Sequence, residues 1–451
     1  MKVLKFGGTS VGTIESLRNV KAIVESNTER TVMVVSALGG LTDRLIETAK
    51  KAERGDESYR DEIAAMKTRH IDIIDALVPE EQRSDLLKDV DLLFSQLERT
   101  YTGICLLEEL SCRSLDKVVS FGERLSSRIV ARIITGARLF DSLAFIKTLR
   151  RFDRHVLDND ITLQLIDSAF GDCDFRIAVV PGFISTDSNG VITNLGRGGS
   201  DYTAAILAAA LNASSLEIWT DVDGFMTADP RLIPSAKVIP ALSFTEAMEL
   251  CNFGAKVIYP PTIYPVFHKN IPIFIKNTFN PSAPGTKIHD VGSRNGEPVD
   301  AKGVTSLAAT SLLTIEAQEN IRSKVLNILS RSGVSVLLAT PTDENHRISY
   351  SIASSEIGLA RTALETEFYA EIETGEMTPV RIEEDLSTVA IVADDLKNNK
   401  EISQRVSKAI DASDLDIRAW TAAAPETSIS LVVRKDDRCR ALQLLHNEFF
   451  S

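Results

Sequence analysis

The first part of the chain alternates apolar strand-like runs with helix-like segments, and this alternation constrains the fold most. Residues 3–6 are followed by Gly7 and Gly8, and residues 31–36 lead to Gly39 and Gly40, each before a helix. The pattern is typical of a mainly parallel sheet covered by helices on both faces. Loops of such a sheet gather at the carboxyl ends of the strands, where ligands bind.

Further segments extend this pattern. We expect strands at residues 118–122, 177–180, 216–220 and 271–276. The charged stretch at about 47–115 has helical periodicity and few helix breakers, which predicts a helical insertion. Ser243 and Glu246 have the spacing of a capping box that opens a helix. The loop at 280–285, with its prolines and glycine, marks the approach to the end of this part.

The last third of the chain repeats itself. After a shift of 81 residues, Val325 falls on Val406 and Leu329 on Ile410, without a gap. Each copy reads strand, helix, strand, strand, helix, with two-strand ribbons at 334–340 with 347–353 and at 416–420 with 428–433. This order predicts two small ferredoxin-like units with helices on one face of a sheet.

Composition limits the class of protein. At 451 residues, two or three domains are expected. A net charge of -13 argues against a general nucleic-acid binder, whose phosphate contacts need clustered Lys and Arg. No apolar run approaches the ~20 residues of a membrane helix, and no signal peptide is expected. Scattered cysteines without metal-ligand spacing indicate reduced thiols and a cytoplasmic location, and the sequence predicts no protein-bound metal site.

Four segments could carry chemistry. Lys5 is either a surface residue of an edge strand or a cation at the ligand end of the sheet, and the adjacent glycine pair favours phosphate contact. Arg197 lies among three glycines and could bind a carboxylate or be a solvated loop residue. Glu123 could hold an ammonium group or be a helix-start carboxylate. The stretch 220–224 has two acids, Asp221 and Asp223, that could orient Mg²⁺ or a nucleotide, or it could be a solvated turn.

Two phosphate-binding motifs are excluded or discounted. No GxxxxGK[ST] sequence is present, so the chain is not a P-loop enzyme. Residues 196–201 superficially match a dinucleotide fingerprint, but the last glycine is missing and the stretch lies in the middle of the chain. The six histidines form no cluster, and no catalytic role is expected for them.

Taken together, these segments resemble the aspartate kinases of the amino-acid kinase family. The matching stretches are KFGGTSV at 5–11, VSA at 35–37, SFGE at 120–123, LGRGGSDY at 195–202, WTDVDG at 219–224, DPR at 229–231 and FGAKV at 253–257. The resemblance implies a carbamate-kinase-like αβα sandwich, of class α/β, followed by two ferredoxin-like ACT domains. The implied domains are a catalytic domain at 1–295, including the insertion, and ACT domains at 305–385 and 386–451.

The resemblance also implies roles for individual residues. Lys5 would contact the phosphates and stabilise charge on the transferring group. Asp201 would lie near the amino group of aspartate or organise the transfer site. A second group of residues would surround aspartate, and a third would hold the nucleotide. The aspartate group is Ser36, Thr42, Glu123, Arg197 and Ser200. The nucleotide group is Lys5, Gly7, Gly8, Thr220, Asp221, Arg231 and Lys256. ATP is the expected co-substrate, with Mg²⁺, and a homodimer through the ACT domains is expected.

Elementary chemistry agrees with this assignment. The aspartate side chain, with a free pKa of ~3.9, is already ionised at neutral pH, so no general base is needed. Catalysis then reduces to positioning two anions and screening their repulsion. An arginine and a glutamate together suit a zwitterionic amino acid, one for its α-carboxylate and one for its ammonium group.

Departures from the family pattern bear on regulation. Met226 stands where relatives commonly have Tyr, and Tyr259 where they have His. The glycine-rich effector loop of the first ACT unit reads EAQEN at 316–320 here, and the second unit has DDLK at 394–397. We therefore predict that feedback inhibition by threonine is weak or absent. The C-terminal stretch 446–450 is most similar to the kinase half of bifunctional aspartokinase–homoserine dehydrogenases, whose NAD-binding half would be fused to, or missing from, this chain.

Two alternatives remain at the level of the sequence. One is another enzyme of the amino-acid kinase family, acting on glutamate, N-acetylglutamate or UMP. The 120–123 and 195–202 segments and the tandem repeat argue against it. The other is a catalytically silent amino-acid sensor built on ACT domains. Such a sensor is expected to lose Lys5, Arg197 or Asp221, and all three are present.

Overall fold

The computed structural model describes residues 1–151, 154–171, 173–290, 301–342, 346–393, 396, 400–421 and 427–451. By packing, the chain forms two compact units. The first is Met1–Gly224 with Ile258–Asp290, and the second is Phe225–Val257 with Val291–Ser451. No helix among the described residues combines the length and the apolar character needed to cross a bilayer.

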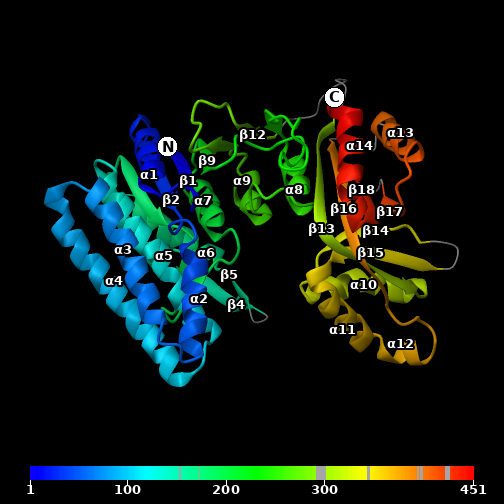
Figure 1. Ribbon diagram of the computed structural model, residues 1–451, viewed down its shortest axis with the longest axis horizontal. Coiled ribbons are helices and arrows are strands. Elements are labelled where there is room, and N and C mark those ends of the chain that lie inside the picture. The colour runs from blue at the N-terminus through cyan, green and yellow to red at the C-terminus, as the bar shows by residue number, and fades with distance from the viewer. Residues whose placement is uncertain are drawn as a thin grey trace. The chain divides into compact units, whose positions relative to one another are not determined.

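The first unit is built on a sheet with the strand order β12-β11-β9-β1-β2-β6-β3 (Figure 1). All of these strands run parallel to their neighbours except β12, which is antiparallel to β11. This confirms the predicted parallel sheet. The strands are β1 (Lys2–Phe6), β2 (Thr31–Val35), β3 (Ala137–Leu139), β6 (Ile177–Pro181), β9 (Ser215–Thr220), β11 (Ile273–Asn277) and β12 (Thr286–Ile288).

Side chains of the central strands alternate between two buried faces. Leu4, Phe6, Met33 and Val35 share one hydrophobic cluster with the helices before β3. Lys5 points to the other face, where α7 packs on β1, β2 and β9. The helices are α1 (Ile14–Glu25), α2 (Leu41–Glu53), α3 (Tyr59–Leu77), α4 (Glu80–Leu107), α5 (Cys112–Ile133), α6 (Asn159–Phe170), α7 (Gly199–Ala210) and α9 (Ile263–Phe267).

The region predicted as a helical insertion, 47–115, contains α3, α4 and parts of α2 and α5. Two hairpins lie outside the main sheet, β4 (Thr148–Arg151) with β5 (Arg154–Leu157) and β7 (Ile184–Thr186) with β8 (Ile192–Asn194). Short 3-10 turns are present at Ser142–Ala144 and Pro260–Thr262.

The strand predicted at 118–122 is wrong, because these residues lie inside α5. Val118 and Val119 favour a strand locally, but Val118, Phe121, Leu125 and Ile129 recur at helical spacing and are all buried. Packing of this amphipathic face on the sheet and on α2 and α4 outweighs the local preference.

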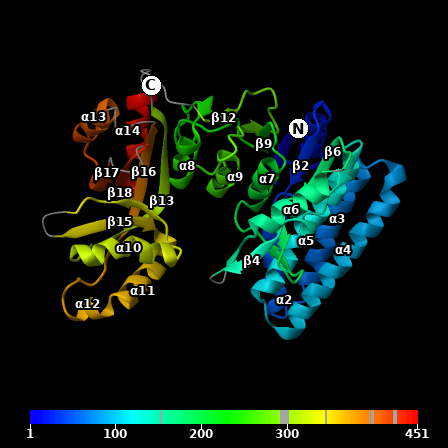
Figure 2. The same ribbon diagram turned by 180° about the vertical axis from the view of Figure 1, so that it is seen from behind.

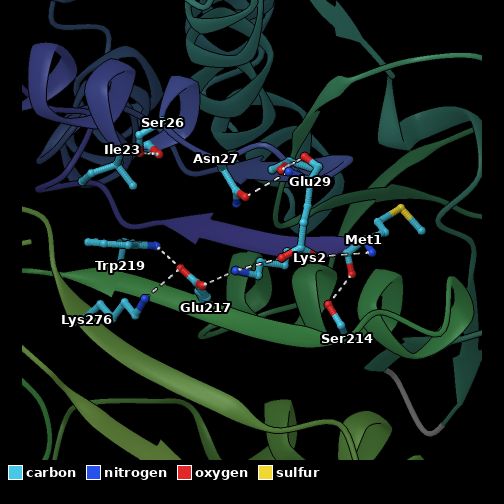
Figure 3. Close-up of polar contacts among 11 residues, drawn as sticks. Met1, Lys2, Ile23, Ser26, Asn27, Glu29, Ser214, Glu217, Trp219 and Lys276 are labelled. Carbon is cyan, nitrogen blue, oxygen red and sulfur yellow. Dashed lines mark hydrogen bonds and ion pairs between the residues drawn. The ribbon is translucent and has the colours of Figure 1, made fainter.

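An acidic side chain links three neighbouring parallel strands inside the sheet. Glu217 on β9 lies between Lys2 of β1 and Lys276 of β11, with carboxylate–ammonium distances of 3.8 and 3.4 Å (Figure 3). The indole Nε1 of Trp219 donates a hydrogen bond to Glu217 over 3.0 Å. Leu4 pairs with Glu217 in register, so this cluster lies on the face opposite to Lys5. Its role is therefore structural.

The second unit contains one sheet with the order β14-β15-β13-β16-β18-β17 (Figure 2). The predicted order of strand, helix, strand, strand, helix is confirmed in both copies. The first copy is β13 (Ala301–Glu316), α10 (Glu319–Arg331), β14 (Val336–Ala339), β15 (Arg347–Ala353), a 3-10 turn at Ser354–Glu356, α11 (Ile357–Glu367) and α12 (Tyr369–Glu373). The second is β16 (Arg381–Ala393), α13 (Lys400–Asp411), β17 (Ile417–Thr421), β18 (Ser428–Arg434), a 3-10 turn at Lys435–Asp437 and α14 (Arg438–Phe450).

The two copies share their long strands. The carboxyl half of β13 pairs with β15 and with the amino half of β16, whereas the amino half of β13 pairs with the carboxyl half of β16. β18 in turn pairs with β16 only over Leu386–Val392. Each ferredoxin-like unit therefore takes its fourth strand from the long strand of the other copy.

The segment 225–257 packs with the second unit. The Val304 N–H donates to the Thr227 carbonyl over 2.7 Å, and the Ser428 hydroxyl donates to Glu249 over 3.0 Å. This segment holds β10 (Ala241–Leu242) and α8 (Phe244–Asn252), and the predicted capping box at Ser243 is confirmed. The two units are defined by packing and do not test the predicted domain limits. The limits 1–295, 305–385 and 386–451 therefore stay predictions. Of the loop at 394–397, only Leu396 is described.

Candidate active site

The carboxyl ends of four neighbouring strands define the candidate site. Sheet pairing continues one residue beyond the strands. The Gly7 N–H donates to the Trp219 carbonyl over 3.1 Å. In the same way, the Ser36 N–H donates to the Phe6 carbonyl over 3.2 Å, and the Gly182 N–H donates to the Val35 carbonyl over 2.9 Å. The loops after β9, β1, β2 and β6 therefore start side by side. This is the gathering of glycine-rich loops that the sequence pattern predicts.

A buried ion pair lies at this edge. Lys5 Nζ is 2.5 Å from Asp201 Oδ1, and only 11% and 12% of the two side chains is exposed. Lys5 comes from the end of β1, and Asp201 from the first turn of α7, so the pair joins segments distant in the sequence. At such low exposure the charges interact far more strongly than surface pairs do.

Two helices begin at this edge without a side-chain cap. Gly40 precedes α2 and Gly198 precedes α7, and both glycines have left-handed backbone, with φ of 76° and 66°. Backbone N–H groups of each first turn therefore remain available as donors to a ligand. Together with the positive end of the helix dipole, they favour an anion.

Among the acids of the site, Glu123 has the pKa that is shifted furthest from its ordinary value. It lies on α5, is 4% exposed, and accepts a hydrogen bond from the Ala37 N–H at Oε1 over 3.1 Å. Its other oxygen, Oε2, has no hydrogen-bond partner among the described residues. Burial raises the pKa of Glu123 to about 8, opposed by the Ala37 hydrogen bond and by the charge of Lys5. A ligand ammonium group would satisfy the free oxygen.

The loop before α7 is held by close backbone packing. A Cβ on Gly182 would lie 2.7 Å from the Cβ of Ser200, and a Cβ on Gly198 would overlap Tyr259. Phe183 has φ of 66°, and the Ile184 N–H spans it to the Gly182 carbonyl over 2.6 Å, as in a γ-turn. Positive φ costs a non-glycine residue free energy, and such strain clusters at functional sites.

The remaining predicted residues of the first unit are more open. Ser36 and Thr42 are half-buried, on either side of Gly39 and Gly40, whereas Arg197 is exposed and has no polar partner among the described residues. Thr220 donates from its hydroxyl to the exposed Asp221 over 3.2 Å.

Two of the predicted nucleotide residues, Arg231 and Lys256, belong to the second unit. Arg231 is exposed and pairs with Asp229 over 2.7 Å, and this contact raises the pKa of Arg231. Lys256 is exposed. Their predicted contact with the nucleotide stays a prediction.

The sequence did not single out the residues that orient the Arg197 loop. Asn194 Nδ2 donates to Asp116 over 2.6 Å, and the Gly196 N–H donates to Asn194 Oδ1 over 2.8 Å. Asp116 is on α5, seven positions before Glu123 and hence on the same side of that helix. The misassigned strand at 118–122 hid this relation, which a helical wheel of α5 would have displayed.

The described residues contain no group of three or more His, Cys, Asp or Glu side chains placed to hold a metal ion. The acids of the WTDVDG loop are engaged locally, since Asp223 accepts hydrogen bonds from Asn277 and Asn280 over 2.8 and 3.2 Å. The exposed Asp221 is the acid of this loop whose carboxylate could join the phosphate oxygens of a bound nucleotide as a ligand of Mg²⁺.

Family models match both parts of the chain. The amino acid kinase family matches residues 1–277, and an ACT domain matches residues 389–449.

Relatives with curated names are similar along the whole chain. The chain is 33% identical to a bifunctional aspartokinase/homoserine dehydrogenase of Haemophilus influenzae, covering 100% of this chain and 57% of that protein. It is 29% identical to the lysine-sensitive aspartokinase 3 of Escherichia coli, covering 100% of this chain and 99% of that protein. The chain thus spans little more than half the length of the bifunctional relatives.

Solved structures of similar fold also cover the whole chain. The crystal structure of E. coli aspartokinase III in complex with aspartate and ADP has a TM-score of 0.86 and 28% identity, with 100% of both chains covered. The aspartate kinase of Clostridium acetobutylicum has a TM-score of 0.80 and 25% identity over the same coverage.

Proposed function

The chain belongs to the amino acid kinase family, and we propose that it transfers the γ-phosphoryl group of ATP to the side-chain carboxylate of L-aspartate. One observation carries the proposal. A buried lysine, Lys5, lies at the carboxyl edge of the sheet between glycine loops, pairs with Asp201, and acts electrostatically on the buried Glu123. The full-length similarity to aspartokinases supports aspartate as the acceptor.

The reaction needs little covalent chemistry from the protein. An oxygen of the aspartate side chain attacks the γ-phosphorus, the bond to the β–γ bridging oxygen breaks, and ADP leaves with the electron pair. Both reactants are anions, and therefore the protein must hold them in line and offset their repulsion. Mg²⁺, bound to ATP as part of the substrate, would neutralise phosphate charge.

Lys5 is the side chain that would bind the transferring phosphoryl group and stabilise its charge. Its Nζ would lie 3.6 Å from a Cβ on Gly7, so the ammonium group is next to the first residue of the glycine loop. When ATP binds, the γ-phosphoryl oxygens would compete with Asp201 for Lys5. Asp201 thus keeps Lys5 aimed at the site in the free protein.

The acceptor side of the site has complementary charges. The free Oε2 of Glu123 would receive the α-ammonium group of aspartate, while Arg197 would bind the α-carboxylate as a fork. Ser36, Thr42 and Ser200 would supply hydroxyl donors around the side-chain carboxylate. The roles of these residues, and of Gly7, Gly8, Thr220, Asp221, Arg231 and Lys256 at the nucleotide, are part of the proposal.

The test compares acceptors and removes Lys5. ADP release with MgATP is measured with L-aspartate, L-glutamate, N-acetyl-L-glutamate and UMP, and the acyl phosphate is trapped as the hydroxamate. We expect turnover with aspartate alone and a kcat about 10²–10³-fold lower in Lys5→Met. Lys2→Met, which removes a lysine of the same strand from the opposite face, serves as control. Turnover with another acceptor, or wild-type kcat in Lys5→Met, would contradict the proposal.

Two further proposals concern the assembly and location. A homodimer formed through the ACT domains is the first of these, and it rests on the resemblance to the aspartate kinases. Sedimentation of the whole chain tests this. The five cysteines are free, which supports a cytoplasmic location. A homoserine dehydrogenase half, fused to or missing from this chain, is proposed from the bifunctional relatives, and the alternative is a monofunctional kinase of the length of the E. coli relative.

A further inference from the structure

Arg69 on α3 links the two glycine loops of the site. Its Nη1 donates to the Gly39 carbonyl over 2.9 Å, and its Nη2 donates to the Gly12 carbonyl over 2.8 Å. α3 lies in the helical insertion, outside the sheet and its loops. One guanidinium group therefore reaches from the insertion to the loop after β1 and to the loop after β2.

The two carbonyls are at the ends of these loops. Gly12 precedes Thr13, the N-cap of α1, and Gly39 precedes Gly40, the N-cap of α2. The loops otherwise meet backbone to backbone. A Cβ on Gly8 would lie 3.2 Å from the Ala37 carbonyl oxygen, and one on Gly39 would lie 3.0 Å from the Gly8 carbonyl oxygen. Among the described residues, no backbone hydrogen bond joins 7–13 directly to 37–41.

The charge of Arg69 is not used in an ion pair. Its neighbour Arg44 pairs with Glu62 over 2.8 Å, whereas no ion pair of Arg69 is present among the described residues. Burial and the charge of Arg44 both lower the pKa of Arg69. Placing a half-buried cation here without an acidic partner is costly. In return, the planar guanidinium fork donates from its two terminal nitrogens to the two carbonyls at once, a geometry that is specific to arginine.

We propose that Arg69 is a positioning residue for phosphoryl transfer, because it holds the loop that follows Lys5 and the loop that presents Ser36 and Thr42 in one fixed relation. The first loop belongs to the ATP side of the proposed site and the second to the aspartate side, so this inference rests on the proposed function. A misplacement of the two reactants by about 1 Å can cost about 10²-fold in rate.

The test uses Arg69→Gln and Arg69→Lys. Arg30→Gln is the matched control, since Arg30 Nη2 likewise donates to two carbonyls, of Phe170 and Cys173, but just before β2, at the opposite end of the strand. We expect kcat of Arg69→Gln to fall about 10–100-fold, with each KM changed less than about threefold, because each loop still binds its own substrate. Arg69→Lys, which keeps the charge but presents one nitrogen in place of the two of the guanidinium fork, should have an intermediate kcat. Arg30→Gln should keep the wild-type kcat.

Amide hydrogen exchange provides a readout that does not depend on activity. In Arg69→Gln, exchange in 7–13 and 37–42 should become about tenfold faster, while 199–210 keeps its wild-type rate. Unchanged exchange in both loops, or a kcat within twofold of wild type, overturns the inference. If Arg69→Gln does not fold, the same two measurements on Arg69→Lys decide. If the wild-type protein has no kinase activity, the proposed function fails, and exchange alone decides whether Arg69 holds the loops.

Discussion

Glu123 leads to a quantitative prediction about pH. Burial raises the pKa of Glu123 to about 8, so about one-tenth of the free enzyme carries the carboxylate at pH 7 and about half at pH 8. Only the carboxylate binds an ammonium group well, and the apparent affinity scales with the competent fraction. The KM for aspartate should therefore fall about fivefold from pH 7 to pH 8.

The assay measures initial rates at saturating MgATP while aspartate is varied between pH 6.5 and pH 8.5. Glu123→Gln keeps an oxygen that can accept from Ala37 but removes the charge. A hydrogen bond to a charged group contributes about 1.5–3 kcal/mol, so the KM of this variant should rise about 10–100-fold and lose its pH dependence below pH 8.5. Glu249→Gln is the control, because burial also raises the pKa of Glu249, which lies in the second unit.

The same residue predicts a change in stability. Between the unfolded pKa of 4.5 and the folded pKa of about 8, the folded state retains a proton that the unfolded state has lost. The stability contributed by protonated Glu123 is thus complete below pH 4.5 and is lost as pH rises towards 8, by up to about 5 kcal/mol. At pH 8, Glu123→Gln should unfold at a higher temperature than the wild-type protein. A wild-type KM that stays constant from pH 6.5 to pH 8, or a Glu123→Gln variant with wild-type KM, would refute the reasoning.

Two other predictions concern backbone and stability. Gly198→Ala places a methyl group on the Tyr259 ring in a left-handed conformation and should abolish activity, whereas Gly190→Ala, with φ of 75° and open space, should cost only about 1 kcal/mol and stay active. Hydroxamate formation and thermal unfolding of both variants test this, and equal activity would contradict it. Burial lowers the pKa of His70 to about 4, so the stability of the wild-type protein relative to His70→Gln should fall by about 2 kcal/mol from pH 7 to pH 5, as the unfolded wild-type chain binds the proton. Urea unfolding of both proteins at the two pH values measures this difference, in which the contribution of Glu123 cancels.

Local sequence gave correct predictions where neighbouring residues decide the conformation. Strands β1, β2, β6 and β9 are short apolar runs, and each was predicted to within a residue or two. The capping box at Ser243 was equally clear, because both partners lie within one turn of helix. The prediction failed at 118–122, where two valines favour a strand and only packing on the sheet favours a helix.

The second unit illustrates the limit of repeat detection. The 81-residue offset identified five elements in each copy. It could not reveal that β13 and β16 each serve both copies, because one strand supplies different halves to two pairings. Strand pairing depends on hydrogen bonds between segments about 80 positions apart, and no local periodicity encodes that partner.

The sequence by itself determined the class of fold and the edge of the sheet where the chemistry is expected, because strand ends and glycine loops are local features. It also supplied Lys5, Glu123 and Asp201 as candidates. Only the tertiary structure decided that Lys5 pairs with Asp201, that Glu123 is buried with one free oxygen, and that Arg69 joins two loops. These relations depend on how far water is excluded and on which distant segments meet, and both arise from packing of the whole unit.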